Sequence, residues 1–442
     1  MSSTKNCTPY YLSAATITMK KYAFLSFTVL VFSAISGFAQ STLMQPIPTP
    51  SRVIVTNTIP QTQPVRTPTP FPRPSATPII VGGSMGGSNT AAQSSNLNYK
   101  GLSFAQIKSK LAEARRYLTA RPLTIASSEP TGMPIVQTGV IRVAFYDKKT
   151  RQIDSYVLSK DQFLEHGLAT VVTTANGKQY VSRTIRGNGV NTPLVITDQS
   201  GQEHLPLMVQ YPRETRGVMT EMAYYVSSHP ELTTPEVVNA GRFYVRNTID
   251  VAREHLKSKG YAIQPKIADI AERLATVEHV DQLRFRTEFH PNIYNDIFTL
   301  YALNEGQTYR YSVSSAGAGG MIQMIAPTYH MVRSRYPNAA LMPDFVEGMR
   351  NHVNASQAML LYIQMTWNDL AASPTINSAM QSGIATQEQL LAAGYNSNPS
   401  KLAKYINRGG ASWTVLIPRE TQIYLQVWSS LERAVPQTPR KQ

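Results

Sequence analysis

The sequence has very little cysteine and few acidic residues, and both shortages limit what the protein can be. Cys7 is the only cysteine among 442 residues, so the chain cannot form an intramolecular disulfide and must rely on a packed hydrophobic core. Lysine and arginine total 42 against 27 for aspartate and glutamate, a formal net charge of +15, and no acidic residue precedes Glu113. This excess of positive charge favours attraction to acidic partners.

The sequence also lacks the residue patterns of a metal site and of nucleic-acid binding. His279 has no second histidine at ligand spacing, so we interpret it as a structural residue. No nucleic-acid-binding motif is present, and nothing in the sequence implies a cofactor. We therefore predict a protein that binds no metal ion, no cofactor and no nucleic acid.

Residues 1–39 have the pattern of a secretory signal peptide. A pair of lysines precedes the apolar run 22–35, and the small residues before Gln40 suit cleavage after Ala39. Met19 stands directly before the basic pair and is an alternative start of translation. Because the apolar run is short for a membrane span, we predict an exported protein, periplasmic or secreted. An inner-membrane anchor formed by the uncleaved signal is the alternative.

Residues 40–98 are rich in proline, glycine and serine. Such a composition cannot bury a hydrophobic core, so we predict a disordered tether. No acidic residue in the segment opposes Arg52, Arg66 and Arg73. Outside the cytoplasm, anionic wall polymers and lipid head groups are the partners that this charge suits, and no partner protein is indicated.

Hydrophobic periodicity divides the rest of the chain into several segments. A helix and a β-rich module are predicted over residues 99–215, because strand-like runs flank Asn-Gly and Ser-Gly turns. Helical patterns over residues 216–285, beginning with 219–226, indicate a helical extension. A mainly helical C-terminal domain follows over residues 286–434, before a tail at 435–442. The predicted fold class is therefore α+β.

A lone carboxyl group stands at the end of an apolar helix in the C-terminal domain. Glu305 is the only acidic residue between Asp296 and Asp344, and Gly306 after it is typical of a left-handed helix stop. We expect Glu305 in the last helical turn, where apolar neighbours and the negative end of the helix dipole disfavour the charged form. A carboxyl group that keeps its proton can act as a general acid. The alternative is an ordinary solvated glutamate.

A glycine-rich loop and two further sequence blocks follow Glu305. The loop, residues 314–324, is Ser-Ser-Ala-Gly-Ala-Gly-Gly-Met-Ile-Gln-Met, and the later blocks are Ala-Ala-Gly-Tyr-Asn at 392–396 and Pro-Arg-Glu-Thr-Gln-Ile-Tyr at 418–424. This order resembles the soluble lytic transglycosylases of the lysozyme-like superfamily, whose catalytic glutamate precedes a Ser-x-x-Gly-Ala-x-Gly-Leu-Met-Gln loop. The resemblance covers about residues 292–431 and implies a lysozyme-like catalytic domain.

The resemblance also implies an activity and roles for particular residues. Glu305 would be the catalytic acid that cleaves the β-1,4 bond between N-acetylmuramic acid and N-acetylglucosamine in peptidoglycan without water, leaving a 1,6-anhydro end. Ser314, Gln323 and Asn396 would contact the sugar, and Tyr395 would form a hydrogen bond near the acid. One carboxyl group suffices for this reaction, whereas an ordinary glycoside hydrolase needs a second one.

The chain departs from the family pattern at several positions, and two alternative functions stay open. Gly306 stands where the family commonly has serine, and Gly394 interrupts the Ala-Tyr-Asn block. A lysozyme-type hydrolase would recruit Asp344 or Glu420 to hold a water molecule. A catalytically silent wall-binding protein is the other alternative. Trp413, in a predicted loop, is a further candidate for the sugar groove.

Export should remove residues 1–39 and leave a mature chain that begins at Gln40, because the small residues before this position suit signal peptidase. Expression in a bacterium, periplasmic fractionation and N-terminal sequencing measure this. Ala39→Lys is the matched control, since a large charged residue at the cleavage position should block processing. Recovery of the unprocessed wild-type chain in the membrane fraction would support the anchor instead.

Overall fold

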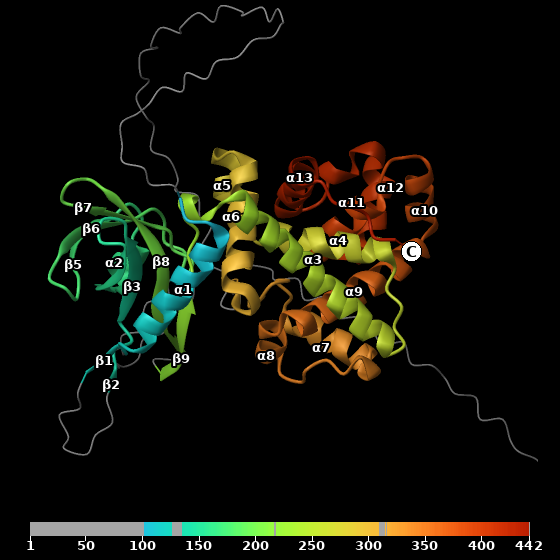
Figure 1. The fold of residues 1–442 in the computed structure, drawn as a ribbon. Helices are drawn as coiled ribbons and strands as arrows, with labels where there is room; N and C mark the ends of the chain where they lie inside the picture. Colours follow the sequence, from blue (N-terminus) through green and yellow to red (C-terminus); the bar gives the residue numbers. More distant parts are fainter. Residues whose placement is uncertain (1–100, 126–134, 216–217, 309–313, 315, 442) are drawn as a thin grey trace, which may run out of the picture. The chain divides into compact units, whose positions relative to one another are not determined.

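The computed structural model describes residues 101–125, 135–215, 218–308, 314 and 316–441. The predicted signal peptide and tether lie outside these residues. The chain divides into two units, residues 1–54 and 55–442, and all described residues belong to the second (Figure 1). No helix in the described part of the chain combines the length and apolar character that a membrane span requires.

A helix and a curled antiparallel sheet form the N-terminal part. The strand order is β4-β3-β8-β7-β6-β5, and β9 pairs with the second half of β8. The curl brings the two ends of the sheet together, since the N–H of Ala175 after β5 donates to the Ser155 carbonyl in β4 at 3.2 Å. The elements are α1 (Phe104–Thr119), β1 (Thr124–Ile125), β2 (Ile135–Val136), β3 (Val140–Asp147), β4 (Gln152–Ser159), α2 (Lys160–Leu164), β5 (Ala169–Thr173), β6 (Gln179–Thr184), β7 (Leu194–Asp198), β8 (Glu203–Thr215) and β9 (Val218–Tyr225).

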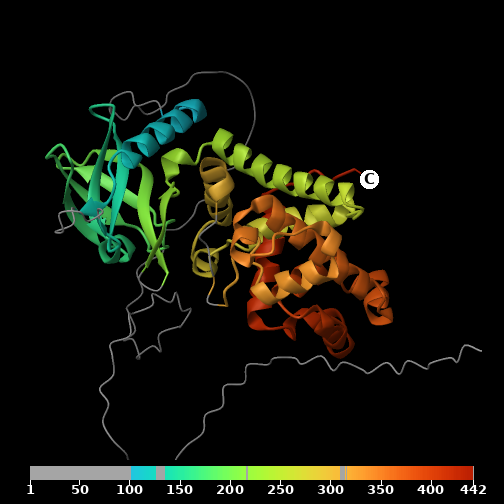
Figure 2. The same ribbon diagram turned by 90° about the horizontal axis from the view of Figure 1, so that it is seen from below.

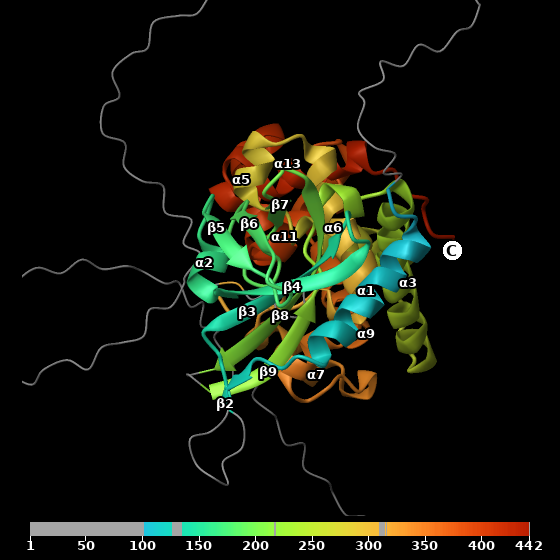
Figure 3. The same cartoon turned by 60° about the vertical axis from the view of Figure 1, so that its left-hand side comes forward.

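Both faces of β3 are buried, because the strand lies between α1 and the inside of the curl (Figure 3). Val143 and Phe145 point into the curl, where they join one hydrophobic cluster. Ala144 and Tyr146 alternate with them and pack with α1 in a second cluster. A capping box at Ser103 starts α1, as expected for a serine before an apolar periodic run.

Helices form the remainder of the described chain. Their bounds are η1 (Pro230–Leu232), α3 (Pro235–Ser258), α4 (Pro265–Val277), α5 (Gln282–Thr287), α6 (His290–Asn304), η2 (Glu305–Gln307), α7 (Ala326–Arg335), η3 (Pro337–Ala339), α8 (Phe345–Arg350), α9 (His352–Ala371), α10 (Pro374–Gln381), α11 (Gln387–Asn396), η4 (Pro399–Lys401), α12 (Leu402–Gly409), η5 (Gly410–Val415) and α13 (Arg419–Ala434). One hydrophobic core extends through α3, α4, α6, α9, α11 and α13. The predicted α+β class is therefore confirmed.

The helix predicted at residues 219–226 is wrong, because this segment forms strand β9. Its residues pair with β8 from Val209↔Tyr225 to Thr215↔Val218. Ala223 and Tyr225 are buried two residues apart, which is the period of a strand. Pairing with the long strand β8 outweighs the weak helical propensity of this short segment.

Helices α3 and α6 pack closely and connect the sheet to the helical core (Figure 2). A Cβ atom added at Gly241 in α3 would lie 1.9 Å from the Phe298 carbonyl oxygen in α6, so only glycine permits this approach. At the end of α6, the Asn304 side chain accepts from the Val226 N–H at 2.8 Å and donates to the Val226 carbonyl at 2.9 Å. These two bonds attach the end of α6 to the residue after β9.

The C-terminal tail lies along α3 and α4. The Arg440 side chain is 4% exposed, and its guanidinium lies 2.6 Å from Asp250, 2.9 Å from Asp269 and 2.7 Å from Glu272. The Gln437 amide donates to the Asp269 carbonyl at 3.1 Å. The predicted tail is therefore attached to α3 and α4 through the Arg440 and Gln437 side chains.

Gly241→Ala should destabilise the protein by about 1–3 kcal/mol, because the added methyl forces α3 away from α6 and outweighs the higher helix propensity of alanine. Urea denaturation followed by circular dichroism measures this change. Gly139→Ala is the control, since nothing lies within 4 Å of a Cβ atom added there. Equal stability of the two variants would contradict the proposed close contact.

Candidate functional site

The three residues predicted to contact sugar line one cavity together with Tyr395, which was predicted to form a hydrogen bond near the acid. Ser314, Gln323, Tyr395 and Asn396 surround a space of about 730 Å³. They come from the glycine-rich loop and from the end of α11, segments far apart in the sequence. The structure thus brings together the residues of two separate sequence blocks.

The glycine-rich loop has a backbone shape that its own residues maintain. Gly320 has φ +70°, and a Cβ atom there would lie 2.6 Å from the Met349 carbonyl oxygen, so the position requires glycine. The Ser314 hydroxyl accepts from the Ala318 N–H at 3.0 Å. Gln323 has φ +48°, and its amide donates to the Gly320 carbonyl at 2.9 Å. Ser314 and Gln323 therefore shape the loop as well as line the cavity.

Helix α11 contributes one polar side chain to the loop and another to α13. The Tyr395 hydroxyl donates to the Ile322 carbonyl at 2.7 Å. The Asn396 side-chain oxygen accepts from the Thr421 hydroxyl at 2.8 Å. The three sequence blocks of the C-terminal domain therefore meet at this cavity.

A glutamate that the sequence analysis did not select lies in the same cavity. Glu278 caps the C-terminal end of α4, a helix with an apolar buried face. The Tyr424 hydroxyl donates to Glu278 Oε1 at 2.5 Å. Burial raises the pKa of Glu278 to about 8, against the lowering effect of the bond from Tyr424, and the nearby Glu420 carboxylate adds to the rise. The protonated form of Glu278 is therefore favoured at neutral pH.

Glu305 does not lie with these residues. It caps the C-terminal end of α6, and its side chain is 58% exposed, 2.8 Å from the Lys108 ammonium in α1. This setting differs from the apolar one expected. The left-handed backbone conformation also falls on Glu305, with φ +45°, and not on Gly306. Gly306 lines a different cavity, which Tyr244 and His352 share.

One part of the pattern used to select Glu305, the position at the end of an apolar helix, also describes Glu278. Each residue follows an apolar helix, α6 in one case and α4 in the other. Glu278 stands farther from the glycine-rich loop in the sequence, because α5 and α6 lie between them. Spacing along the chain therefore favoured Glu305, whereas packing places Glu278 at the loop.

Other predicted residues take different positions. Trp413 is 1% exposed and donates from Nε1 to the Ile384 carbonyl at 3.2 Å, so the prediction of a sugar-groove tryptophan is wrong. It fills the core because η5 packs against α12 and α13. Asp344 caps α8 by accepting from the Glu347 N–H at 2.8 Å. Glu420, at the start of α13, lines the cavity of Glu278.

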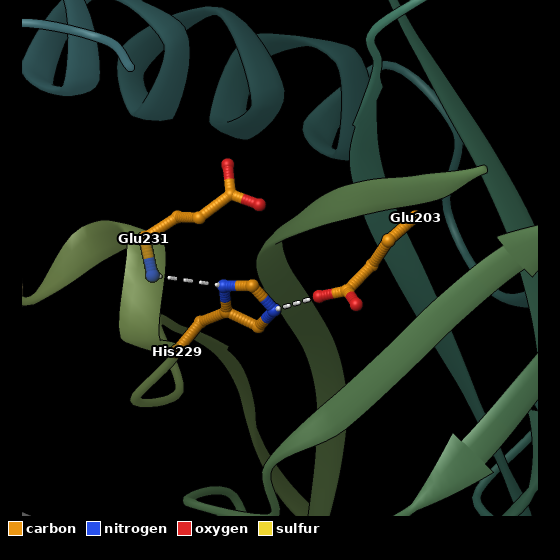
Figure 4. Close-up of side chains that lie close together, drawn as sticks. All are labelled: Glu203, His229 and Glu231. Atoms are coloured by element: carbon orange, nitrogen blue, oxygen red, sulfur yellow. Dashed lines mark hydrogen bonds and ion pairs between the residues drawn. The ribbon is translucent and has the colours of Figure 1, made fainter. Parts of the chain in front are cut away.

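One group of described residues has the composition of a metal site, namely Glu203, His229 and Glu231, whose ligand atoms lie within 4.8 Å of one another (Figure 4). The Glu231 N–H donates to His229 Nδ1 at 3.3 Å, which places the ring proton on Nε2, 3.2 Å from Glu203 Oε1. A protonated Nε2 has no lone pair for a metal ion. Lys148 already pairs with Glu231. We therefore interpret the group as a charge network that joins β8 to the segment before α3.

No protein-family model matches the chain, and neither do any curated proteins or solved structures with which it was compared. The evidence for a function is therefore the cavity itself. It combines a protonated carboxyl group, a glycine-rich wall and several side chains able to form hydrogen bonds.

Glu278 should make the stability of the protein depend on pH. Its pKa is about 8 in the folded protein and near the ordinary 4.5 when unfolded, so its contribution is complete below 4.5 and is lost as pH rises through 8. Glu278→Gln cannot ionise. The melting temperature of this variant minus that of wild type should therefore be several degrees larger at pH 9 than at pH 5. Calorimetry at both pH values measures the difference. Glu305→Gln, which removes an exposed carboxylate, should show the same change of melting temperature with pH as wild type. The same change in Glu278→Gln as in wild type would contradict the burial of Glu278.

Proposed function

We propose that the protein is a peptidoglycan lytic transglycosylase whose catalytic acid is Glu278. The observation that carries the proposal is the position of Glu278, protonated at neutral pH, in one cavity with Ser314, Gln323, Tyr395 and Asn396. These four residues belong to the blocks that resemble the lytic transglycosylases. Glu305 lies outside the cavity, so the acid role passes to Glu278. A lysozyme-like arrangement of the surrounding helices is part of the same proposal.

The geometry of Glu278 suits proton transfer to a leaving oxygen. Tyr424 holds Oε1, which leaves Oε2 to carry the proton toward the cavity. Glu278 protonates the oxygen of the β-1,4 bond, and the substrate's own acetamido group stabilises the cationic sugar. The muramyl 6-hydroxyl then attacks the same carbon and returns its proton to Glu278. A 1,6-anhydro ring closes and no water is consumed.

The lining of the cavity suits a neutral polysaccharide. Among the described residues that line it, the acidic ones are Glu420 and the protonated Glu278. Ser397, Asn398 and Thr328 supply further hydroxyl and amide groups, and Ile325 supplies an exposed apolar surface. Hydroxyl and amide groups recognise sugar hydroxyls and acetamido groups by hydrogen bonds. A basic exported chain would also be attracted to the anionic polymers of a bacterial wall.

A lysozyme-type hydrolase is the second candidate, because Glu420 lines the same cavity as Glu278. Hydrolysis with a second carboxylate requires two such groups on opposite sides of the bond. Asp344, the other base considered, caps α8 and does not line the cavity. The chemical nature of the new chain end separates the two reactions.

Purified mature protein should solubilise peptidoglycan sacculi, and Glu278→Gln should reduce the rate by roughly two to four decades, because the amide cannot transfer a proton. Glu305→Gln is the matched control: the same change at the end of α6 should leave the rate within about threefold of wild type. Release of soluble fragments, with melting curves for each variant, measures both effects. Loss of activity only in Glu305→Gln would return the acid role to that residue.

Mass spectrometry of the fragments tests the reaction type in the same experiment. Transglycosylation gives 1,6-anhydromuramic ends, which are one water lighter than hydrolysis products and resist borohydride. Reducing ends together with a large loss of rate in Glu420→Gln would establish the hydrolase. Binding without turnover by the wild-type chain would leave a wall-binding protein.

A further inference from the structure

We propose that His279 is a positioning residue of this site: its Nε2–H holds the Met321 carbonyl and thereby fixes the glycine-rich loop at the end of α4, beside the acid. The inference rests on the proposed function, since it assigns His279 a part in the reaction of Glu278. The two residues are neighbours in the sequence. The end of α4 therefore presents both the acid and the imidazole that binds the glycine-rich loop.

The contact of His279 is a fixed hydrogen bond. His279 Nε2 lies 2.9 Å from the Met321 carbonyl oxygen. A carbonyl only accepts, so Nε2 carries the proton and donates. Burial lowers the pKa of His279 to about 3, so the ring stays neutral across the working range of pH. The centroid of the Tyr301 ring lies 6.3 Å from that of the imidazole, in an edge-to-face arrangement.

Two successive carbonyl groups of the loop accept hydrogen bonds from side chains of two different elements. His279, at the end of α4, binds the carbonyl of Met321, and Tyr395, in α11, binds that of Ile322. The next residue, Gln323, has the left-handed φ of +48° and lines the cavity. Release of the Met321 carbonyl would therefore let Gln323 move relative to Glu278. A displacement of about 1 Å at a reacting centre can cost on the order of 100-fold in rate.

The loop also contributes to the burial of Glu278. In the described part of the chain, the titratable groups that face Glu278 are Tyr424 and Glu420 from α13, Tyr395 from α11 and Tyr362 from α9. None of these four belongs to the loop, which closes the cavity with uncharged residues. Loosening the loop would admit water without changing the neighbouring charges. The pKa of Glu278 would then fall toward its ordinary value.

Three substitutions separate the hydrogen bond from the packing of the ring. His279→Gln places an amide N–H near the position of Nε2, His279→Asn is too short to reach Met321, and His279→Phe keeps the ring contact with Tyr301 but cannot donate. In the sacculus assay, we expect His279→Asn and His279→Phe to lower kcat by about 10- to 100-fold with little change in KM. His279→Gln should keep most of the wild-type rate. The exposed His255 in α3 supplies the control, His255→Phe, which should match wild type.

The pH profile gives a readout that simple destabilisation would not change. Activity depends on protonated Glu278 and should fall as pH rises through about 8 in wild type. In His279→Asn and His279→Phe this fall should occur at least half a pH unit lower, while His279→Gln should keep the wild-type profile. Wild-type kcat and profile in His279→Phe would overturn the proposal. Equal losses of kcat in His279→Gln and His279→Phe would also overturn it, because they would assign the effect to the imidazole ring and not to its hydrogen bond.

Hydrogen exchange keeps the inference testable if the proposed reaction fails. Mass spectrometry should show faster exchange in the loop around Met321 in folded His279→Phe than in wild type or His279→Gln, whatever the substrate. Unchanged exchange would remove the role of His279. Inactive wild-type protein with faster loop exchange in His279→Phe would instead reject only the proposed function and the catalytic part of the inference.

Discussion

The site depends on the burial of one carboxyl group at the end of α4. Glu278 remains in the cavity because it keeps its proton and accepts a hydrogen bond from Tyr424. An ionised group in the same place would need a positive partner, and among the residues that the structure describes no lysine or arginine lines this cavity. The protonated state is therefore both a condition of the packing and the property that a general acid requires.

Hydrogen bonds and close packing from several elements support the end of α4 and the loop beside it. Tyr395 from α11 and His279 beside the acid bind adjacent carbonyls of the glycine-rich loop, and α13 supplies Tyr424. Gly241 permits the close packing of α3 on α6, and the tail adds a buried arginine to α3 and α4. Sites built on such supported elements maintain their geometry better than sites on isolated loops.

The sheet and the helical core are joined by polar contacts. Asn304 binds the backbone of Val226 after β9, and Glu231 pairs with Lys148 in the turn between β3 and β4. Glu305 takes part in the same junction through Lys108 of α1. The residue that resembled a catalytic acid thus connects a helix end to the N-terminal helix, and its exposure is explained by this position.

Local sequence patterns were sufficient for the α+β class and for most strands of the sheet, and the family resemblance selected four polar residues that lie in one cavity. Turn residues, periodicity and short motifs act over a few residues, and such signals persist in the fold. They did not identify the strand at 218–225, the buried Trp413 or the carboxyl group beside Ser314 and Gln323. Helices α4 and α6 both end in a glutamate, and this local pattern does not distinguish Glu278 from Glu305. In the sequence α5 and α6 separate Glu278 from the loop. Only tertiary packing, which returns the loop to the end of α4, decides which glutamate lies in the cavity.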